Sequence, residues 1–284
     1  MVRRFWRGLR TVAAVVIAAA LLWQGLLLRD RLREAEAASS RAGWIPGPPE
    51  VTAHRGASAS APENTLAAIR LAIEEGADWA EIDVQESADG EVVVFHDDSL
   101  RRISGSGRRV ESCTWEELQR LDAGSWFSPK YAGERIPSLE QALDCARGKI
   151  GLCIELKDEG DSLSSKTADL ILRHGMADQV VVTSWSLNAL GAVQKRAPSI
   201  PTGLICTRVK YLEPAWPEAD FFSIDTRSVD QELINSIHYW GKEVWVWTAE
   251  DEETVSRLLD EGADNILSND PALVRGVIEA RKKR

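Results

Sequence analysis

The chain has 284 residues, of which 44% are hydrophobic, 27% charged and 7% aromatic. This is the composition of a globular protein and excludes a largely disordered chain. The formal net charge of −10, with no basic stripe outside the two termini, argues against a nucleic-acid partner. Any phosphate site must therefore bring its own positive charge, from a metal ion or a few basic side chains.

The N-terminal segment is predicted to anchor the chain in a membrane. Residues 11–28 read TVAAVVIAAALLWQGLLL, an uncharged run long enough to cross a bilayer as one helix. Arginines at positions 3, 4, 7 and 10 are expected to keep residues 1–10 in the cytoplasm and to place the rest of the chain on the extracytoplasmic side. The alternative is a cleaved signal peptide and a secreted protein, with small residues over Ala35–Ser40 as the cleavage region. The sequence RDRLRE directly after the apolar run favours the uncleaved anchor.

Residues 29–49 are charged at first and then rich in Ala, Ser, Gly and Pro, which is typical of a linker or stalk. From residue 50 to 284, apolar runs alternate with amphipathic helical stretches, a pattern that predicts βα units around a parallel sheet. The predicted strands are 51–54, 79–84, 152–156, 180–184, 202–206, 221–224, 243–247 and 265–267. Eight such strands predict a TIM-type (β/α)8 barrel, the α/β class.

One interval, between the second and third predicted strands, is too long for a simple βα loop. It begins with a short extra strand over 91–96, after the Asp89-Gly90 turn signal. A Gly/Ser/Arg-rich stretch, a helix over 115–121 and a Gly/Pro-rich run to Pro137 follow. We interpret residues 91–137, approximately, as a small insertion at the barrel mouth, where barrel enzymes carry their substrate loops.

The cysteines at positions 113, 145, 153 and 206 lack CxxC spacing, which argues against a structural zinc site. We interpret them as small buried apolar side chains, with disulfides as the alternative in an extracytoplasmic domain. Cys145 and Cys153 are then the first pair to consider.

Acidic side chains lie on strands that are otherwise built from Val, Ile and Leu. Glu81 and Asp83 are two residues apart on the second strand and therefore share a face, and Glu155 lies on the third strand. Carboxylates on such strands are costly unless they bind something. Three of them aimed into one barrel mouth predict an oxygen site suited to Mg²⁺ or Ca²⁺.

Basic side chains and histidines end strands in the same region. His54 and Arg55 follow the first strand, His96 closes the extra strand with Asp97 directly after it, and Lys157 is two residues from Glu155. A lone histidine is more often structural, but His54 and His96 end strands beside the acidic trio.

The stretch AHRGASASAPENTLAAIRLAIEEGADWAEIDVQESADGEVVVFHDDSL resembles the N-terminal signature of the glycerophosphodiester phosphodiesterase family. The resemblance continues through TWEELQRLDAGSWF, ERIPSLEQAL, IELK, TSWS, VWVWT and GADNILSNDP, and covers residues 51–274. It implies a TIM barrel with a small insertion that hydrolyses glycerophosphodiesters to an alcohol and glycerol 3-phosphate.

By matching position, the resemblance also implies roles for individual residues. Glu81, Asp83 and Glu155 would hold one divalent metal, while Arg55 and Lys157 would bind the phosphate. His54 and His96 would form the general acid/base pair. Which histidine is the acid, and whether a cyclic phosphate forms, stays open.

Supporting positions carry weaker predictions. Asn64 is expected to cap the first helix, and Asp97 either orients His96 or touches the metal. Trp185 and Trp247 end strands at the mouth, where they line the alcohol pocket or pack the upper core.

The chain departs from the family pattern at its last motif. Ser268, Asn269, Asp270 and Pro271 stand where Thr-Asp-x-Pro is common, so that Asn269 keeps hydrogen bonding but loses a charge. Glu250 follows VWVWT where relatives often carry Asn. Both differences bear on substrate choice more than on the reaction.

Three functions remain open. The first is hydrolysis of water-soluble glycerophosphodiesters. The second is the same chemistry on lysophospholipids or lipid-linked polymers, which the predicted anchor motivates. The third is a binding module without catalysis, which the complete set of ligand and histidine positions disfavours. Ca²⁺ and Mg²⁺ both suit the site.

Overall fold

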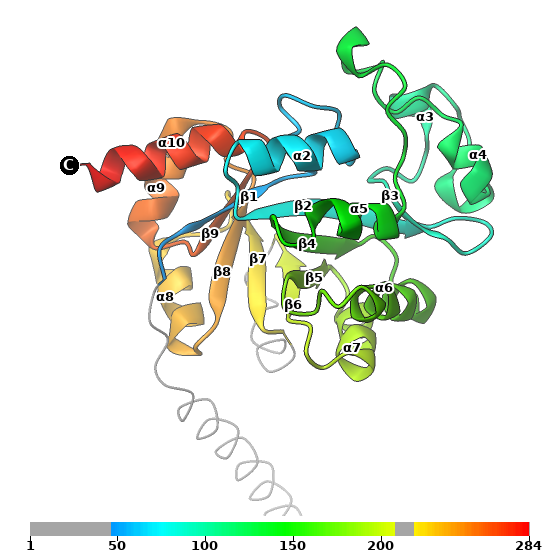
Figure 1. The fold of residues 1–284 in the computed structure, drawn as a ribbon. Helices are drawn as coiled ribbons and strands as arrows, with labels where there is room; N and C mark the ends of the chain where they lie inside the picture. Colours follow the sequence, from blue (N-terminus) through cyan, green and yellow to red (C-terminus); the bar gives the residue numbers. More distant parts are fainter. Residues whose placement is uncertain (1–46, 208–218, 284) are drawn as a thin grey trace, which may run out of the picture. The chain divides into compact units, whose positions relative to one another are not determined.

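The structure, a computed structural model, describes residues 47–207 and 219–283. Eight strands form a closed parallel barrel (Figure 1). They are β1 (Glu50–Ala53), β2 (Trp79–Glu86), β4 (Gly151–Leu156), β5 (Val180–Ser184), β6 (Thr202–Cys206), β7 (Phe221–Asp225), β8 (Glu243–Trp247) and β9 (Asn265–Ser268). Strand β1 pairs with both β2 and β9, which closes the sheet. The predicted TIM-type barrel is confirmed, and each predicted strand is present within two residues of its expected bounds.

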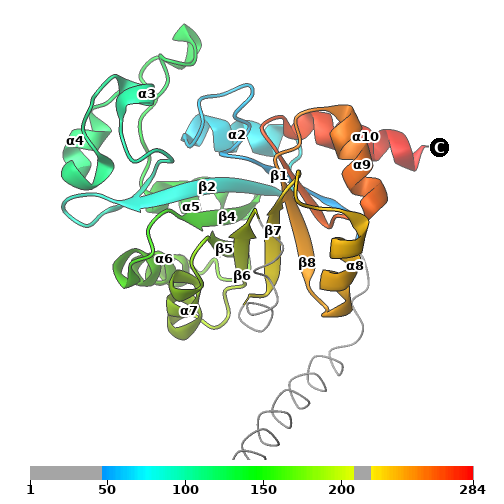
Figure 2. The same cartoon turned by 180° about the vertical axis from the view of Figure 1, so that it is seen from behind.

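Helices surround the barrel on its outer face (Figure 1 and Figure 2). They are α2 (Leu66–Glu74), α5 (Leu139–Ala146), α6 (Asp161–Arg173), α7 (Leu187–Arg196), α8 (Gln231–Tyr239), α9 (Glu252–Glu261) and α10 (Pro271–Lys282). Each turns an apolar stripe inward, as in α8, where Leu233, Ile234 and Ile237 are buried. Polar side chains at the barrel mouth begin several of them, for example Asp251, which accepts a hydrogen bond from the backbone of α9.

The two-residue period of the strands separates the barrel interior from the helix-covered face. On β2, Ala80, Ile82 and Val84 pack in the core between sheet and helices. The alternate residue Trp79 belongs to the interior cluster, where its ring lies 5.5 Å from that of Trp245. That aromatic layer fills the barrel floor, so the next inward positions of β2 lie above a packed apolar plug.

The insertion forms a small satellite core beside the barrel (Figure 1). It contains β3 (Val92–Val94), α3 (Arg101–Ser104), the 3-10 turns η1 (Val110–Ser112) and η2 (Pro129–Tyr131), and α4 (Trp115–Gln119). Strand β3 pairs antiparallel with the extended end of β2, with Val94 opposite Val84. It is shorter than the predicted 91–96, and α4 ends before the predicted Leu121. Thr114 begins α4 through a capping box with Glu117.

The predicted membrane segment, residues 11–28, lies outside the described residues, as do residues 1–10 and nearly all of the predicted linker. In 47–207 and 219–283, no helix has both the length and the apolar character needed to cross a bilayer. The anchor therefore stays a prediction.

The four cysteines all lie in the described part of the chain and none is paired in a disulfide. Cys113 and Cys153 are buried, as expected for small apolar side chains. Cys145 and Cys153, the pair considered first for a disulfide, are not joined.

Candidate active site

Three carboxylates meet above the aromatic floor of the barrel. Glu81 and Asp83 extend from β2, and Glu155 extends from β4, where it is paired in register with Asp83. One oxygen from each carboxylate can be chosen so that all three lie within 4.8 Å of one another. Glu81 and Asp83 are only 3% and 1% exposed, while the Glu155 side chain is 14% exposed. The structure thus brings together the three side chains predicted to bind a metal.

Burial and mutual repulsion make this trio electrostatically costly. Burial, followed by the charges of Asp83 and Glu155, raises the pKa of Glu81 well above its ordinary value. The pKa of Glu155 is raised for the same two reasons, burial first and then Asp83. Burial alone would also raise the pKa of Asp83, but Lys157 and other neighbours lower it. Additional positive charge at this position would therefore be stabilising.

Two cations, Arg55 and Lys157, lie against the trio. The backbone N–H of Arg55 donates to Glu81 Oε2 at 2.7 Å, and its side-chain Nε lies 3.6 Å from Asp83 Oδ2. Arg55 Nε is buried and has no hydrogen-bond partner among the described residues. Lys157 Nζ lies 2.7 Å from Glu155 Oε1 and 3.4 Å from Asp83 Oδ1. Both side chains can therefore present positive charge to an anion at the mouth.

His54 is supported by a neutral amide. Its Nδ1 lies 2.8 Å from Asn269 Oδ1, and Asn269 Nδ2 donates to Glu250 Oε1 at 2.8 Å. Because Asn269 turns its oxygen toward the ring, Nδ1 carries the proton and Nε2 is left as an acceptor. Burial, followed by the nearby Arg55, lowers the pKa of His54 to about 4. His54 is therefore a neutral imidazole near pH 7.

His96 is supported by a carboxylate instead. Its Nδ1 lies 2.8 Å from Asp97 Oδ1, so Asp97 orients the ring, one of its two predicted roles. A hydrogen bond from Arg102 is the main reason that the pKa of Asp97 falls to about 2. Gln85 Nε2 donates to the backbone carbonyls of residues 95, 96 and 97 and fixes the turn that carries His96. His96 therefore has a charged partner where His54 has a neutral one.

The mouth beside His54 and Arg55 is hollow. A cavity of 350 Å³ opens there, and its walls are His54, Arg55, Ser58, Ala59, Glu63, Glu250 and Asn269. Trp185 and Trp247, after β5 and at the end of β8, form an edge-to-face pair with ring centroids 5.8 Å apart. Trp185 is 49% exposed, and Trp247 Nε1 is buried without a partner among the described residues.

Asn64 was predicted to cap the first helix, and that prediction is wrong. Thr65 is the cap of α2, and its side chain accepts from the backbone of Ala68. Asn64 instead donates to Asp83 Oδ2 at 2.8 Å and accepts from the Asp83 backbone N–H at 3.1 Å. Its φ of 57° is in the left-handed region, which asparagine tolerates better than most residues. Because Thr65 caps α2, the Asn64 side chain is not needed at the helix terminus and instead orients Asp83, a candidate metal ligand.

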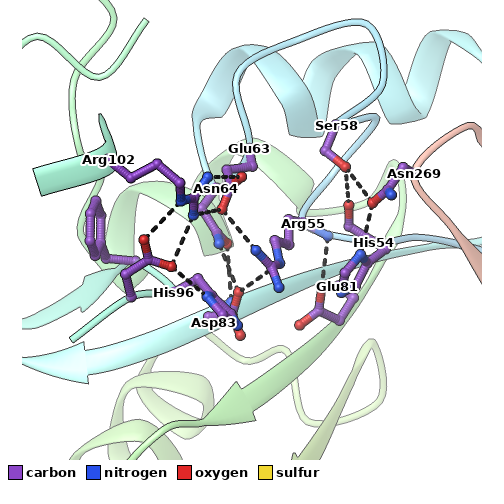
Figure 3. Close-up of polar contacts among 12 residues, drawn as sticks. His54, Arg55, Ser58, Glu63, Asn64, Glu81, Asp83, His96, Arg102 and Asn269 are labelled. Carbon is purple, nitrogen blue, oxygen red and sulfur yellow. Dashed lines mark hydrogen bonds and ion pairs between the residues drawn. The ribbon is translucent and has the colours of Figure 1, made fainter. Parts of the chain in front are cut away.

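Sequence reasoning also missed Glu63 and Arg102. Glu63 Oε1 accepts from Arg55 Nη1 at 3.0 Å, and Arg102 reaches both Glu63 and Asp97 from the insertion (Figure 3). Glu63 lies within the quoted PENT motif, which was a signal for it. Arg102 lies in a stretch with several arginines, where nothing in the local pattern marks its contacts.

Comparison with known proteins connects this geometry to a family. Residues 54–273 match the glycerophosphoryl diester phosphodiesterase family. A glycerophosphodiester phosphodiesterase of Caldanaerobacter subterraneus subsp. tengcongensis is 34% identical over 230 residues, covering 78% of this chain and 94% of the relative.

Two solved structures share the fold at comparable identity. A phosphodiesterase of Oleispira antarctica, in complex with the product sn-glycerol-3-phosphate, is 32% identical with a TM-score of 0.78, covering 81% of this chain and 97% of its own. A glycerophosphodiester phosphodiesterase of Agrobacterium tumefaciens is 30% identical with a TM-score of 0.71, covering 80% and 99%.

Asn64→Ala and Asn64→Gly separate the backbone role of this residue from its side-chain role. Both remove the hydrogen bonds to Asp83, but only alanine is strained at the left-handed φ. We expect the free energy of unfolding of the alanine variant to be lower than that of the glycine variant by roughly 1 kcal/mol. Urea denaturation of the full-length chain measures both. Equal free energies of unfolding for the two variants would contradict a left-handed backbone conformation at residue 64.

Proposed function

The chain belongs to the glycerophosphoryl diester phosphodiesterase family and is a phosphoric diester hydrolase, and we propose that it uses one divalent cation and two histidines to hydrolyse glycerophosphodiesters to an alcohol and sn-glycerol 3-phosphate. The observation that carries the proposal is the buried trio Glu81, Asp83 and Glu155 beside two cations. The Oleispira antarctica structure holds sn-glycerol-3-phosphate, which supports this product.

The residues present fit a hard divalent cation. Glu81 Oε1 is buried without a hydrogen-bond partner among the described residues, next to two further carboxylates. Three carboxylates and water form a ligand set that suits Ca²⁺ or Mg²⁺. When bound, the ion would withdraw charge from a phosphoryl oxygen and help to orient the diester.

Arg55 and Lys157 supply the charge that binds the phosphate. Arg55 Nε faces Asp83 at 3.6 Å without a hydrogen bond, and Glu63 holds Nη1, so the guanidinium brings its charge and its remaining donors to the mouth, where a phosphate oxygen would bind. Lys157 adds a compact charge on the opposite flank of the acidic trio. Arg55 and Lys157 thus supply local positive charge at the barrel mouth, where the phosphate would bind to a protein whose net charge is negative.

The different partners of the two histidines support different roles. His54 is neutral, with Nε2 free to accept, and is suited to take the proton from the attacking oxygen, whether that oxygen comes from water or from glycerol. His96 is held by the Asp97 carboxylate, and we assign it the role of giving a proton to the leaving alkoxide. Trp185 and Trp247 would line the pocket for the departing alcohol.

We further propose that the protein is held in a membrane by residues 11–28, with the catalytic domain on the extracytoplasmic side. The arginine-flanked apolar run supports this location. Lysophospholipids or lipid-linked polymers are then the second substrate class, and the half-exposed Trp185 at the mouth favours an apolar group there.

Release of glycerol 3-phosphate from glycerophosphocholine and glycerophosphoethanolamine tests the reaction. With the full-length protein in detergent, we expect turnover with Ca²⁺ or Mg²⁺ and none in EDTA. His54→Ala, His96→Ala and Glu81→Ala should each lower kcat by about 100-fold or more, because each removes a group used in the chemistry. His174→Ala, which removes a histidine outside the site, should keep activity. A folded, metal-loaded protein that cleaves neither diester would refute the proposal of a soluble substrate. An assay with lysophospholipids would then test the second substrate class.

Cation affinity should depend on pH. The pKa values of Glu81 and Glu155 are raised, so these carboxyls hold protons at higher pH than ordinary glutamates, and a cation must displace them. We expect tighter Mg²⁺ or Ca²⁺ binding at about pH 7.5 than at about pH 5, with proton release. Calorimetry in two buffers of different ionisation enthalpy measures both quantities, with Glu250→Gln as the control. Equal cation affinity at the two pH values would contradict the raised pKa values of Glu81 and Glu155.

A further inference from the structure

One arginine of the insertion joins two carboxylates that belong to the active site. Arg102, in α3, donates from Nε to Asp97 Oδ2 at 2.8 Å and from Nη2 to Asp97 Oδ1 at 2.9 Å. The same guanidinium donates from Nη1 to Glu63 Oε2 at 2.6 Å and from Nη2 to Glu63 Oε1 at 2.8 Å. The Nε/Nη2 edge of Arg102 therefore holds Asp97, and its Nη1/Nη2 edge holds Glu63.

Each of these carboxylates holds a residue with a proposed role in the reaction. Asp97 bonds His96 Nδ1 at 2.8 Å, and Glu63 accepts from Arg55 Nη1 at 3.0 Å. Arg102 is thus linked through Asp97 to His96, the proposed acid, and through Glu63 to Arg55, which is proposed to bind the phosphate.

We propose that Arg102 is a positioning residue, which clamps Asp97 and Glu63 and thereby aligns His96 and Arg55 with each other across the active-site mouth. The proposal rests on the proposed function. It assigns the insertion a part in the reaction, because α3 brings Arg102 to the barrel mouth. Trp126, also in the insertion, holds the guanidinium from one face, with its ring centroid 5.7 Å away.

Charge geometry explains why an arginine is needed. Asp97 and Glu63 repel each other, and a planar fork can bond both at once, whereas a lysine offers only a point charge. The Arg102 side chain is 41% exposed, so its ion pairs contribute little to stability and act mainly by fixing direction. Without it, Asp97 is free to turn from His96 and Glu63 to turn from Arg55.

The two branches can be separated by mutation. Asp97→Asn breaks the branch to His96 and should lower kcat of glycerophosphocholine hydrolysis with little change in KM. Glu63→Gln breaks the branch to Arg55 and should mainly raise KM. Arg102→Gln should do both, with kcat lower by about 10- to 100-fold, because small misplacements of reacting groups carry costs of that order. Arg108→Gln removes another ion pair of the insertion, to Glu117, and should leave both constants unchanged.

Chemical rescue tests the positioning role separately from folding. Methylguanidine added to Arg102→Ala should restore at least part of kcat, since it can fill the same fork. If Arg102→Gln does not fold, Arg102→Lys takes its place; it keeps the charge without the fork and should show the same loss.

The outcomes separate this inference from the proposed function. An inactive wild-type enzyme would overturn both. An active wild type whose folded Arg102→Gln or Arg102→Lys variant keeps kcat within about twofold would overturn the positioning role alone. Failure of methylguanidine to restore kcat to folded Arg102→Ala would do the same.

Discussion

Three carboxylates packed within 4.8 Å at the mouth of a barrel are the constraint on which the rest of the site depends. The two-residue period of β2 places Glu81 and Asp83 on one face, and the register with β4 adds Glu155. An apolar floor that includes Trp79, Phe221 and Trp245 lies beneath them. Arg55, Lys157 and Asn64 are arranged around this trio, and two of them take up unusual backbone to do so: Arg55 and Asn64 both have φ of 57°.

The second organising feature is the difference between the two histidines. An amide oxygen orients His54 and adds no charge, while a carboxylate orients His96. The departure from the family pattern at Asn269 is part of this difference. Asn269 is an uncharged partner, and its amide nitrogen donates to the Glu250 carboxylate while its oxygen faces His54. The two rings thus have different partners, which supports the opposite proton-transfer roles proposed for them.

Local pattern was enough to predict the barrel and the core of the site. β-Branched runs marked the strands, and ionisable residues at strand ends marked Glu81, Asp83, Glu155 and the two histidines. Contacts between distant segments were not predictable in the same way. Arg102 is 39 positions from Glu63, and Asn269 is 215 positions from His54. Asn64 was misread because a neighbouring threonine satisfies the same capping pattern. The membrane anchor lies in residues that the structure does not describe and rests on the sequence alone.

The thermal stability of the protein with and without a divalent cation tests the central claim most directly. If the trio is a cation site, adding excess Ca²⁺ or Mg²⁺ to the EDTA-treated, full-length protein should raise Tm in a concentration-dependent way, because the ion binds the folded state alone. Glu81→Gln removes one charge from the trio, and its Tm in EDTA should be no lower than that of the wild type and insensitive to the cation. An unchanged wild-type Tm, together with a less stable Glu81→Gln protein, would show that these carboxylates serve the fold and not a metal.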